Sequence, residues 1–142
     1  SINVNSQTQT LPVVFKAGIG GKTFTTSQVT AVFEDGNVTI FATRGTEQES
    51  IQIKIKGNIV GTYQANTSVI GYRAGVTEPL FSSVNPADSS VNTGKITISS
   101  VNNVNDRISG TFECTSYNNN GSLTLTKEIT NGVFTNIPFT IN

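Results

Sequence analysis

The sequence predicts an all-β domain, either an antiparallel β-sandwich or a meandering barrel-like fold of about nine or ten short strands. The clearest strand alternates Ile51, Ile53 and Ile55 with polar residues, which is the period of a strand with one buried face. Asn-Gly and Asp-Gly turn signals separate the alternating segments, and no window sustains the 3.6-residue period of a helix. We favour a sandwich with barrel-like curvature, because nothing in the pattern enforces closure.

The domain organisation is predicted to be simple. Residues 1–10 are polar and unpatterned and are expected to be a flexible lead-in, and residues 11–142 are expected to form one domain. The chain contains no Met, so Ser1 is expected to follow a removed segment such as a cleaved export signal, with a lipid anchor possible upstream of Ser1. No apolar run approaches the 18 residues of a membrane-spanning helix.

The first half of the chain is expected to form strands wherever apolar residues alternate. A turn is predicted at 34–37, where Asp-Gly lies between two such segments, and a polar loop at 44–49. At most a turn or two of helix is expected, near Thr26–Val29. The predicted strands cover residues 13–17, 24–33, 38–43, 51–55, 59–63 and 69–74, with a short piece at 79–83.

The second half is predicted to be a meander of four antiparallel strands between Gly94 and Phe139. Turn signals at 102–106, 118–121 and 131–132 divide it. If Asn131-Gly132 is a type I′ turn, Gly132→Val is expected to destabilise the last hairpin, because a β-branched residue resists positive φ. Pro138 lacks a backbone N–H, so the last strand is expected to lie at an edge or to carry a bulge there.

Composition argues against several classes of function. Nine basic and nine acidic residues balance to a net charge of zero, which disfavours a nucleic-acid partner. The chain has no His, which removes Ser-His-Asp and Cys-His catalysis and His-based metal sites, and its single cysteine cannot build a thiolate cluster. Cys114 shares a strand face with Ile108 and Phe112, so a buried structural thiol is expected. Gly18–Thr23 resembles a phosphate loop only weakly and is interpreted as a hairpin loop.

No catalytic residue, metal ligand or cofactor is predicted. Paired carboxylates could act in glycoside hydrolysis, but most acids fall in predicted loops, and mid-strand Glu113 is interpreted as solvent-facing. Asn102–Asp106 offers oxygen ligands for calcium but lacks EF-hand spacing, so it is interpreted as a turn capped by its own Asn side chains. The acids considered are Glu34, Asp35, Glu47, Glu49, Glu78, Asp88, Asp106, Glu113 and Glu128.

Aromatic platforms for sugar binding would have to come from tyrosine or phenylalanine, because the chain has no Trp. Tyr63 and Tyr72 lie in apolar strand patterns and are expected in the core with their hydroxyls at the rim. Tyr117 borders a predicted turn and is expected to be the most exposed of the candidates, which also include Phe81.

Several short segments in a fixed order resemble a known family. They are Gly61-Thr62-Tyr63, the strand starts at 94–98 and 108–112, and Ile129–Phe134 near the end. Together they resemble an uncharacterised domain-of-unknown-function family of secreted or lipid-anchored Bacteroidetes proteins. The resemblance covers nearly the whole chain from Val13 and implies an exported all-β envelope protein located in the periplasm, the outer membrane or the cell surface. It carries over no catalytic or binding residue.

The sequence therefore predicts a non-enzymatic cell-envelope β domain with a binding or structural role. Its partner would be an envelope protein, a glycan or a small apolar ligand, and the sequence leaves the ligand-binding residues unknown. Two alternatives stay open. One is a lipocalin-like carrier of a small apolar ligand, which needs an interior cavity. The other is a carbohydrate-binding module or hydrolase, which needs exposed aromatics or two carboxylates in a cleft.

Overall fold

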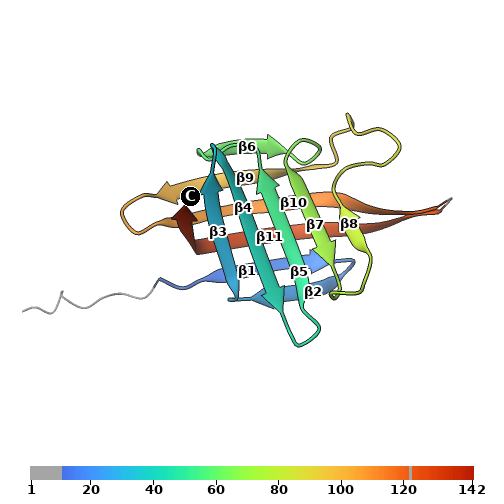
Figure 1. Ribbon diagram of the computed structural model, residues 1–142, viewed down its shortest axis with the longest axis horizontal. Helices are drawn as coiled ribbons and strands as arrows, with labels where there is room; N and C mark the ends of the chain where they lie inside the picture. The colour runs from blue at the N-terminus through green and yellow to red at the C-terminus, as the bar shows by residue number, and fades with distance from the viewer. Residues whose placement is uncertain (1–10, 122) are drawn as a thin grey trace, which may run out of the picture.

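A computed structural model describes residues 11–121 and 123–142; the predicted lead-in, residues 1–10, lies outside the described residues. Within them the chain forms eleven strands and no helix (Figure 1). The strands are β1 (Val14–Ile19), β2 (Lys22–Thr26), β3 (Val29–Glu34), β4 (Asn37–Arg44), β5 (Glu49–Ile55), β6 (Gly61–Gln64), β7 (Val69–Arg73), β8 (Leu80–Ser82), β9 (Gly94–Asn102), β10 (Arg107–Asn120) and β11 (Leu123–Ile141).

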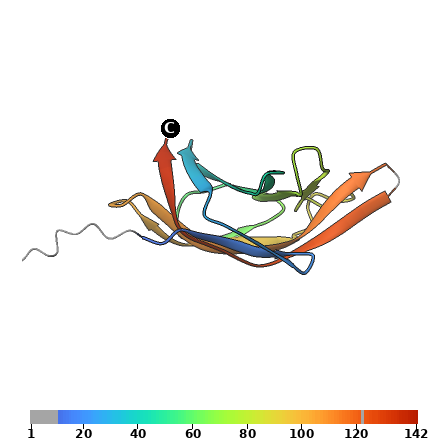
Figure 2. The same ribbon diagram turned by 90° about the horizontal axis from the view of Figure 1, so that it is seen from below.

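The strands form two layers that face each other across one core. The order along the sheet is β2-β1-β11-β3-β4-β5-β7-β8-β10-β9-β6. In Figure 1, β3, β4, β5 and β7 run across β9, β10, β11 and β1, which lie behind them. Figure 2 shows the same layers from the side, with the β10–β11 hairpin extending beyond the body of the domain. The predicted all-β class is confirmed.

Hydrogen bonding closes the sheet into a ring. The alternation pattern of the sequence could not decide whether the sheet closes. β11 pairs with β10 along most of its length and then with β3 at its C-terminal end. The β11–β3 pairing is parallel, whereas the other strand pairs of the described sheet are antiparallel as expected. On the other side, β8 reaches β10 through the single pair Ser82↔Tyr117. The fold is thus a sandwich whose two layers are joined at both sides.

The predicted turn at Asn131-Gly132 is wrong, because both residues lie inside the continuous strand β11. Its pairing with β10 moves from Phe112↔Gly132 to Cys114↔Ile129, so two residues of β11 face one of β10. That is a β-bulge, and Asn131 occupies it with φ of 52°. The four-stranded meander is therefore three strands, β9 to β11.

A second bulge lies farther along β11, close to the position expected from Pro138. The pairing shifts between Ile108↔Ile137 and Gly110↔Phe134, and Asn136 has φ of 54°. Its backbone N–H donates to Oγ of Ser109 at 2.8 Å. Bulges bend a strand and increase its twist. β11 can therefore leave the layer of β10 and continue beside β3, as Figure 2 shows.

Most of the other predicted turns are confirmed, and the differences are local. Asp35 and Gly36 form the β3–β4 turn with positive φ, and Gly20 and Gly21 do the same between β1 and β2. The helical turn expected near Thr26–Val29 is absent from the described chain; there the Thr26 hydroxyl accepts a hydrogen bond from the N–H of Gln28. The predicted strand 59–63 begins only at Gly61, which leaves Ile59 and Val60 in the loop that precedes β6.

The inward-facing side chains of both layers form one apolar cluster. Phe15, Phe24, Phe112 and Phe134 pack in a chain of ring contacts with centroids 5.4–6.3 Å apart. Isoleucines of β4, β5, β7, β9 and β10 complete it, including all three of the Ile51, Ile53 and Ile55 set. Burying one such side chain is worth about 1.5–3 kcal/mol. The alternation in the sequence therefore identifies the core correctly.

Candidate functional site

Two of the motifs singled out from the sequence form turns in the structure. Gly18–Thr23 forms the β1–β2 hairpin, as interpreted. Oδ1 of Asn102 accepts hydrogen bonds from the N–H groups of Val104 and Asn105, which confirms the self-capped turn. The described residues hold no group of three His, Cys, Asp or Glu that could bind a metal.

Cys114 is buried, as predicted, with 4% of its surface exposed. Burial raises the pKa of its thiol to about 12, with smaller contributions from the nearby carboxylates of Glu128 and Glu113. A thiol with so high a pKa holds almost no thiolate at neutral pH and is a poor nucleophile.

The aromatic candidates do not form an exposed sugar platform. Tyr72 and Phe81 are buried, and Tyr63 is partly buried against the core. Tyr117, expected to be the most exposed of the candidates, is partly buried. The hydroxyl of Tyr72 donates to Oε2 of Glu49 at 2.6 Å, and burial followed by this hydrogen bond raises the pKa of Tyr72 above its usual 10.

Glu113 is exposed on β10, as expected, and shares a hollow with another acid. The hollow has a volume of about 430 Å³ and is lined by residues of β10 and β11 that include Glu128. One oxygen of Glu128 accepts a hydrogen bond from the Thr115 hydroxyl at 3.0 Å. The hydrolase alternative would have to be located in a place such as this, and it stays an untested prediction.

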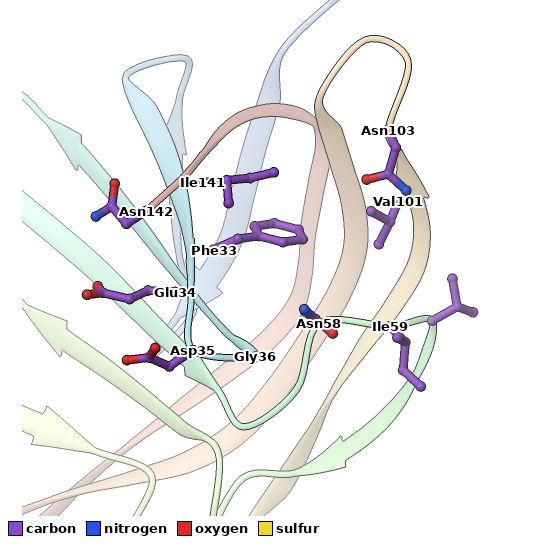
Figure 3. A pocket seen from close by; sticks show the side chains of 11 residues that line it. Phe33, Glu34, Asp35, Gly36, Asn58, Ile59, Val101, Asn103, Ile141 and Asn142 are labelled. Atoms are coloured by element: carbon purple, nitrogen blue, oxygen red, sulfur yellow. The ribbon is translucent and has the colours of Figure 1, made fainter.

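A larger groove, of about 480 Å³, lies at the end of the sandwich where the two layers separate (Figure 3). It is called the end groove below. Its apolar lining comes from Phe33 of β3, Ile141 of β11, Val101 of β9, and the loop residues Ile59 and Val60. The remaining lining residues are Glu34, Asp35, Gly36, Asn58, Asn103 and Asn142.

The sheet closure positions one wall of the end groove. Phe33 and Ile141 are partners in the parallel β3–β11 pairing, so their side chains lie on neighbouring strands. The ring of Phe33 also stacks on the ring of Phe139, with the two centroids 4.1 Å apart. The backbone N–H of Asn142 donates to the carbonyl of Phe33 at 2.9 Å, which fixes the end of the chain. This wall exists only because β11 changes partner.

Tyr63 positions the opposite wall. Its hydroxyl donates to the carbonyl oxygen of Ile59 at 2.6 Å and accepts from the N–H of the same residue at 3.3 Å. The ring also packs against Gly57, where an added Cβ would lie 2.4 Å from it. These contacts hold the loop so that Ile59 and Val60 remain 70% and 59% exposed. Tyr63 is predicted to be a core ring with its hydroxyl at the rim, and in this position it holds the loop that forms one wall of the end groove.

The end groove is lined mainly by apolar side chains and asparagine amides. Its lining combines apolar side chains with asparagine amides and two carboxylates, and it contains no Ser, Cys or Lys that could act as a nucleophile. Its acidic residues are Glu34, the last residue of β3, and Asp35 in the turn that follows, and no basic residue lines it. In Figure 3 the side chains of Ile141 and Phe33 lie near the middle of the view, Val101 and Ile59 lie to the right, and both carboxylates lie to the left.

Sequence reasoning missed this site because its residues look like ordinary strand residues. The signal available was the adjacent pair Ile59-Val60, which breaks the alternation directly after Gly57-Asn58. Two neighbouring apolar residues cannot both face the core of a strand, so one or both had to be exposed or outside the strand.

A family model for the domain of unknown function DUF6252 matches residues 12–138. The chain belongs to this family. No curated protein and no solved structure is significantly similar to it. The DUF6252 match agrees with the resemblance to an uncharacterised family that the order of glycines, turns and strand residues indicated.

The described part of this DUF6252 chain contains no helix that is long and apolar enough to cross a membrane.

Proposed function

We propose that this DUF6252 domain is a non-enzymatic binding domain of the cell envelope and that it holds an apolar segment of a partner protein in the end groove. The observation that carries the proposal is the exposure of Ile59, Val60 and Ile141 around one groove. Large apolar side chains gathered on a surface and rimmed by polar residues are typical of interaction sites.

Charge and shape indicate the kind of segment. The two acids of the lining, with no base among them, favour an apolar segment that carries a lysine or arginine beside its apolar residues. The end groove is open to solvent, whereas pockets for small molecules usually cover 70–90% of the ligand surface. An extended protein segment fits an open groove better than a small ligand does.

The carrier alternative is less well supported. A lipocalin-like carrier holds its ligand in an interior cavity, whereas the space between the two layers here is occupied by one continuous cluster of buried side chains. The envelope location rests on the surface rich in Asn, Ser and Thr and on the family resemblance. An immunoblot of fractionated source cells tests that location.

The binding proposal is tested with displayed peptides. A library of apolar ten-residue peptides, with and without flanking lysines, is selected against the purified protein, and the affinity of selected peptides is measured by calorimetry. We expect lysine-containing apolar peptides to be enriched. Val60→Ser and Ile141→Ser should each weaken their binding about tenfold, a change of about 1.4 kcal/mol.

Leu123→Ser is the matched control, because Leu123 is 56% exposed, close to the 59% of Val60, but lies on the β10–β11 hairpin. Equal losses in Val60→Ser and Leu123→Ser would show that binding is not localised in the end groove and would contradict the proposal. Native mass spectrometry of protein from its own host addresses the carrier, since a small molecule retained only under native conditions would favour that alternative.

A further inference from the structure

A second hollow lies on the outer face of the front layer, away from the end groove. Its volume is about 280 Å³, and it lies over β4, β5 and β7. The register places its side chains in two rows across the strands: Phe41, Gln52 and Gly71 in one, and Thr43, Ser50, Arg73 and Leu80 in the other. Across four strands such a row is about 14 Å long.

Gly71 makes this face concave. With no side chain at that position, the row between Gln52 and β8 is open, and the side chain of Leu80 leans over it, 3.5 Å from where a Cβ of residue 71 would lie. One wall comes from the loop at 45–48 and the loop at 74–79. The N–H of Val76 donates to the carbonyl of Glu47 at 3.3 Å, which ties these loops together.

Phe41 is the central feature of this face. Its side chain is 44% exposed, and it lines both this hollow and a neighbouring one of about 370 Å³ over β3 and β4. The neighbouring hollow is otherwise lined by Ser27, Gln28, Val29, Thr30 and Thr43. The aromatic ring therefore separates two shallow hollows that are rich in hydroxyl and amide groups.

The outer face of β4, β5 and β7 carries positive charge without acids. The outward positions of these strands include Lys54 and Arg73 and no Asp or Glu. The ion pair found within the described residues is Arg44–Glu49, so neither Lys54 nor Arg73 has an acidic partner among them. The Nε atom of Arg73 is also buried without a hydrogen-bond partner in the described chain. An anionic group on a ligand would supply the charge partner that the side chains of Lys54 and Arg73 lack.

From these observations we propose that the outer face of β4, β5 and β7 binds an oligosaccharide that carries carboxylate groups. The ring of Phe41 and the side chain of Leu80 pack against the apolar faces of sugar rings. Gln52, Ser50 and Thr43 exchange hydrogen bonds with sugar hydroxyls. The guanidinium of Arg73 binds a carboxylate, for which its planar fork of donors is suited. This site is independent of the end groove and does not rest on the function proposed for it.

The test uses an array of defined oligosaccharides in which uronic-acid members are matched with neutral members of the same length. We expect the protein to bind one or more acidic members and to bind their neutral counterparts at least about tenfold more weakly. Phe41→Ala and Arg73→Gln should each weaken acidic binding about tenfold, and only Phe41→Ala should weaken the residual neutral binding. Raising the salt concentration should weaken acidic binding, because the charges are at the surface.

Two further variants keep the test decisive. Leu125→Ala is the matched control for Phe41→Ala, because Leu125 is 42% exposed but lies on the β10–β11 hairpin and does not line the hollow, and it should bind like the original protein. Lys54→Gln changes an exposed side chain, and it should weaken acidic binding alone. Absence of binding to every acidic member at millimolar concentration, equal binding of acidic and neutral members, or unchanged binding in Phe41→Ala, Arg73→Gln and Lys54→Gln would each overturn the proposal.

Discussion

At the scale of single residues, the inward or outward position of a side chain decides its chemistry. Cys114 and Glu113 are neighbours in β10, yet the thiol is buried and the carboxylate is exposed, because successive side chains of a strand point to opposite faces. The same alternation places Phe41 on the outer face of β4 between the buried Ile40 and Ala42.

The buried thiol of Cys114 predicts both low reactivity and a loss of stability in alkali. Its pKa of about 12 in the folded protein exceeds the ordinary value of 9, so folding favours the protonated thiol. That contribution is complete below pH 9 and is lost as the pH rises from 9 towards 12. We expect the thiol to be unreactive towards Ellman's reagent at pH 8 in the folded protein and to react at once in denaturant.

The variant Cys114→Ala tests the predicted loss of stability in alkali. Its free energy of unfolding should fall less between pH 9 and pH 11 than that of the original protein, although Tyr72, whose pKa is also raised, contributes a similar loss to both proteins. Equal slopes against pH would contradict the assignment of a raised pKa to Cys114.

At the scale of elements, the two bulges of β11 explain how one strand can serve both layers. Each places an asparagine in the left-handed region, Asn131 in the first and Asn136 in the second. Asparagine tolerates this conformation better than most residues, and a bulge bends the strand that carries it. The Asn-Gly signal at 131–132 thus correctly indicates a positive φ at Asn131. It does not show that this conformation belongs to a β-bulge rather than to a hairpin turn.

Gly132 is required because β10 approaches it closely, and not because a type I′ turn needs a positive φ there. An added Cβ would lie 2.6 Å from the ring and from the carbonyl oxygen of Phe112. Gly132→Ala should therefore lower the free energy of unfolding by about 1–3 kcal/mol, the usual cost of overpacking, and Gly132→Val by more. Chemical denaturation measures the loss.

Gly71→Ala serves as the control for this prediction. It also lies within a strand, but its nearest neighbour would be Leu80 at an ordinary 3.5 Å, so its stability should change little. Asn131→Gly should be tolerated, since the positive φ belongs to residue 131. A stable Gly132→Ala variant would show that β10 and β11 are farther apart here than the structure places them.

At the scale of the whole molecule, the parallel seam between β3 and β11 closes the sheet and builds the end groove. Phe33 and Phe139 are stacked at this seam, and both are buried. Phe139→Ala should lower the free energy of unfolding by about 3–5 kcal/mol, because it removes a buried aromatic ring. It should also speed hydrogen exchange at the amide of Asn142, which donates to Phe33.

Phe41→Ala is the comparison for this change, because Phe41 is a half-exposed phenylalanine of the same layer. It should cost much less stability and leave the exchange of the Asn142 amide unchanged. If Phe139→Ala left that exchange unchanged as well, the backbone pairing of β3 with β11 would be enough to keep the sheet closed. The role given to the stacked side chains of Phe33 and Phe139 would then be wrong.

Much of this protein was predictable from local pattern. The all-β class, the buried isoleucines of β5, the turns at Asp35-Gly36 and Gly20-Gly21, the buried Cys114 and the self-capped turn at Asn102 follow from the sequence. Each depends on residues a few positions apart, where alternation or turn chemistry is sufficient.

Only the tertiary structure decided which distant segments meet. The end groove combines Phe33, Ile59, Val101 and Ile141, and the outer hollow combines Phe41 with Gly71 and Arg73. These contacts depend on strand order and on the bends of β11, which bring together distant residues such as the parallel pair Phe33↔Ile141, 108 positions apart (141 − 33 = 108). A local pattern carries no record of such pairings, because any inward-facing apolar strand satisfies the same alternation whichever neighbour it has.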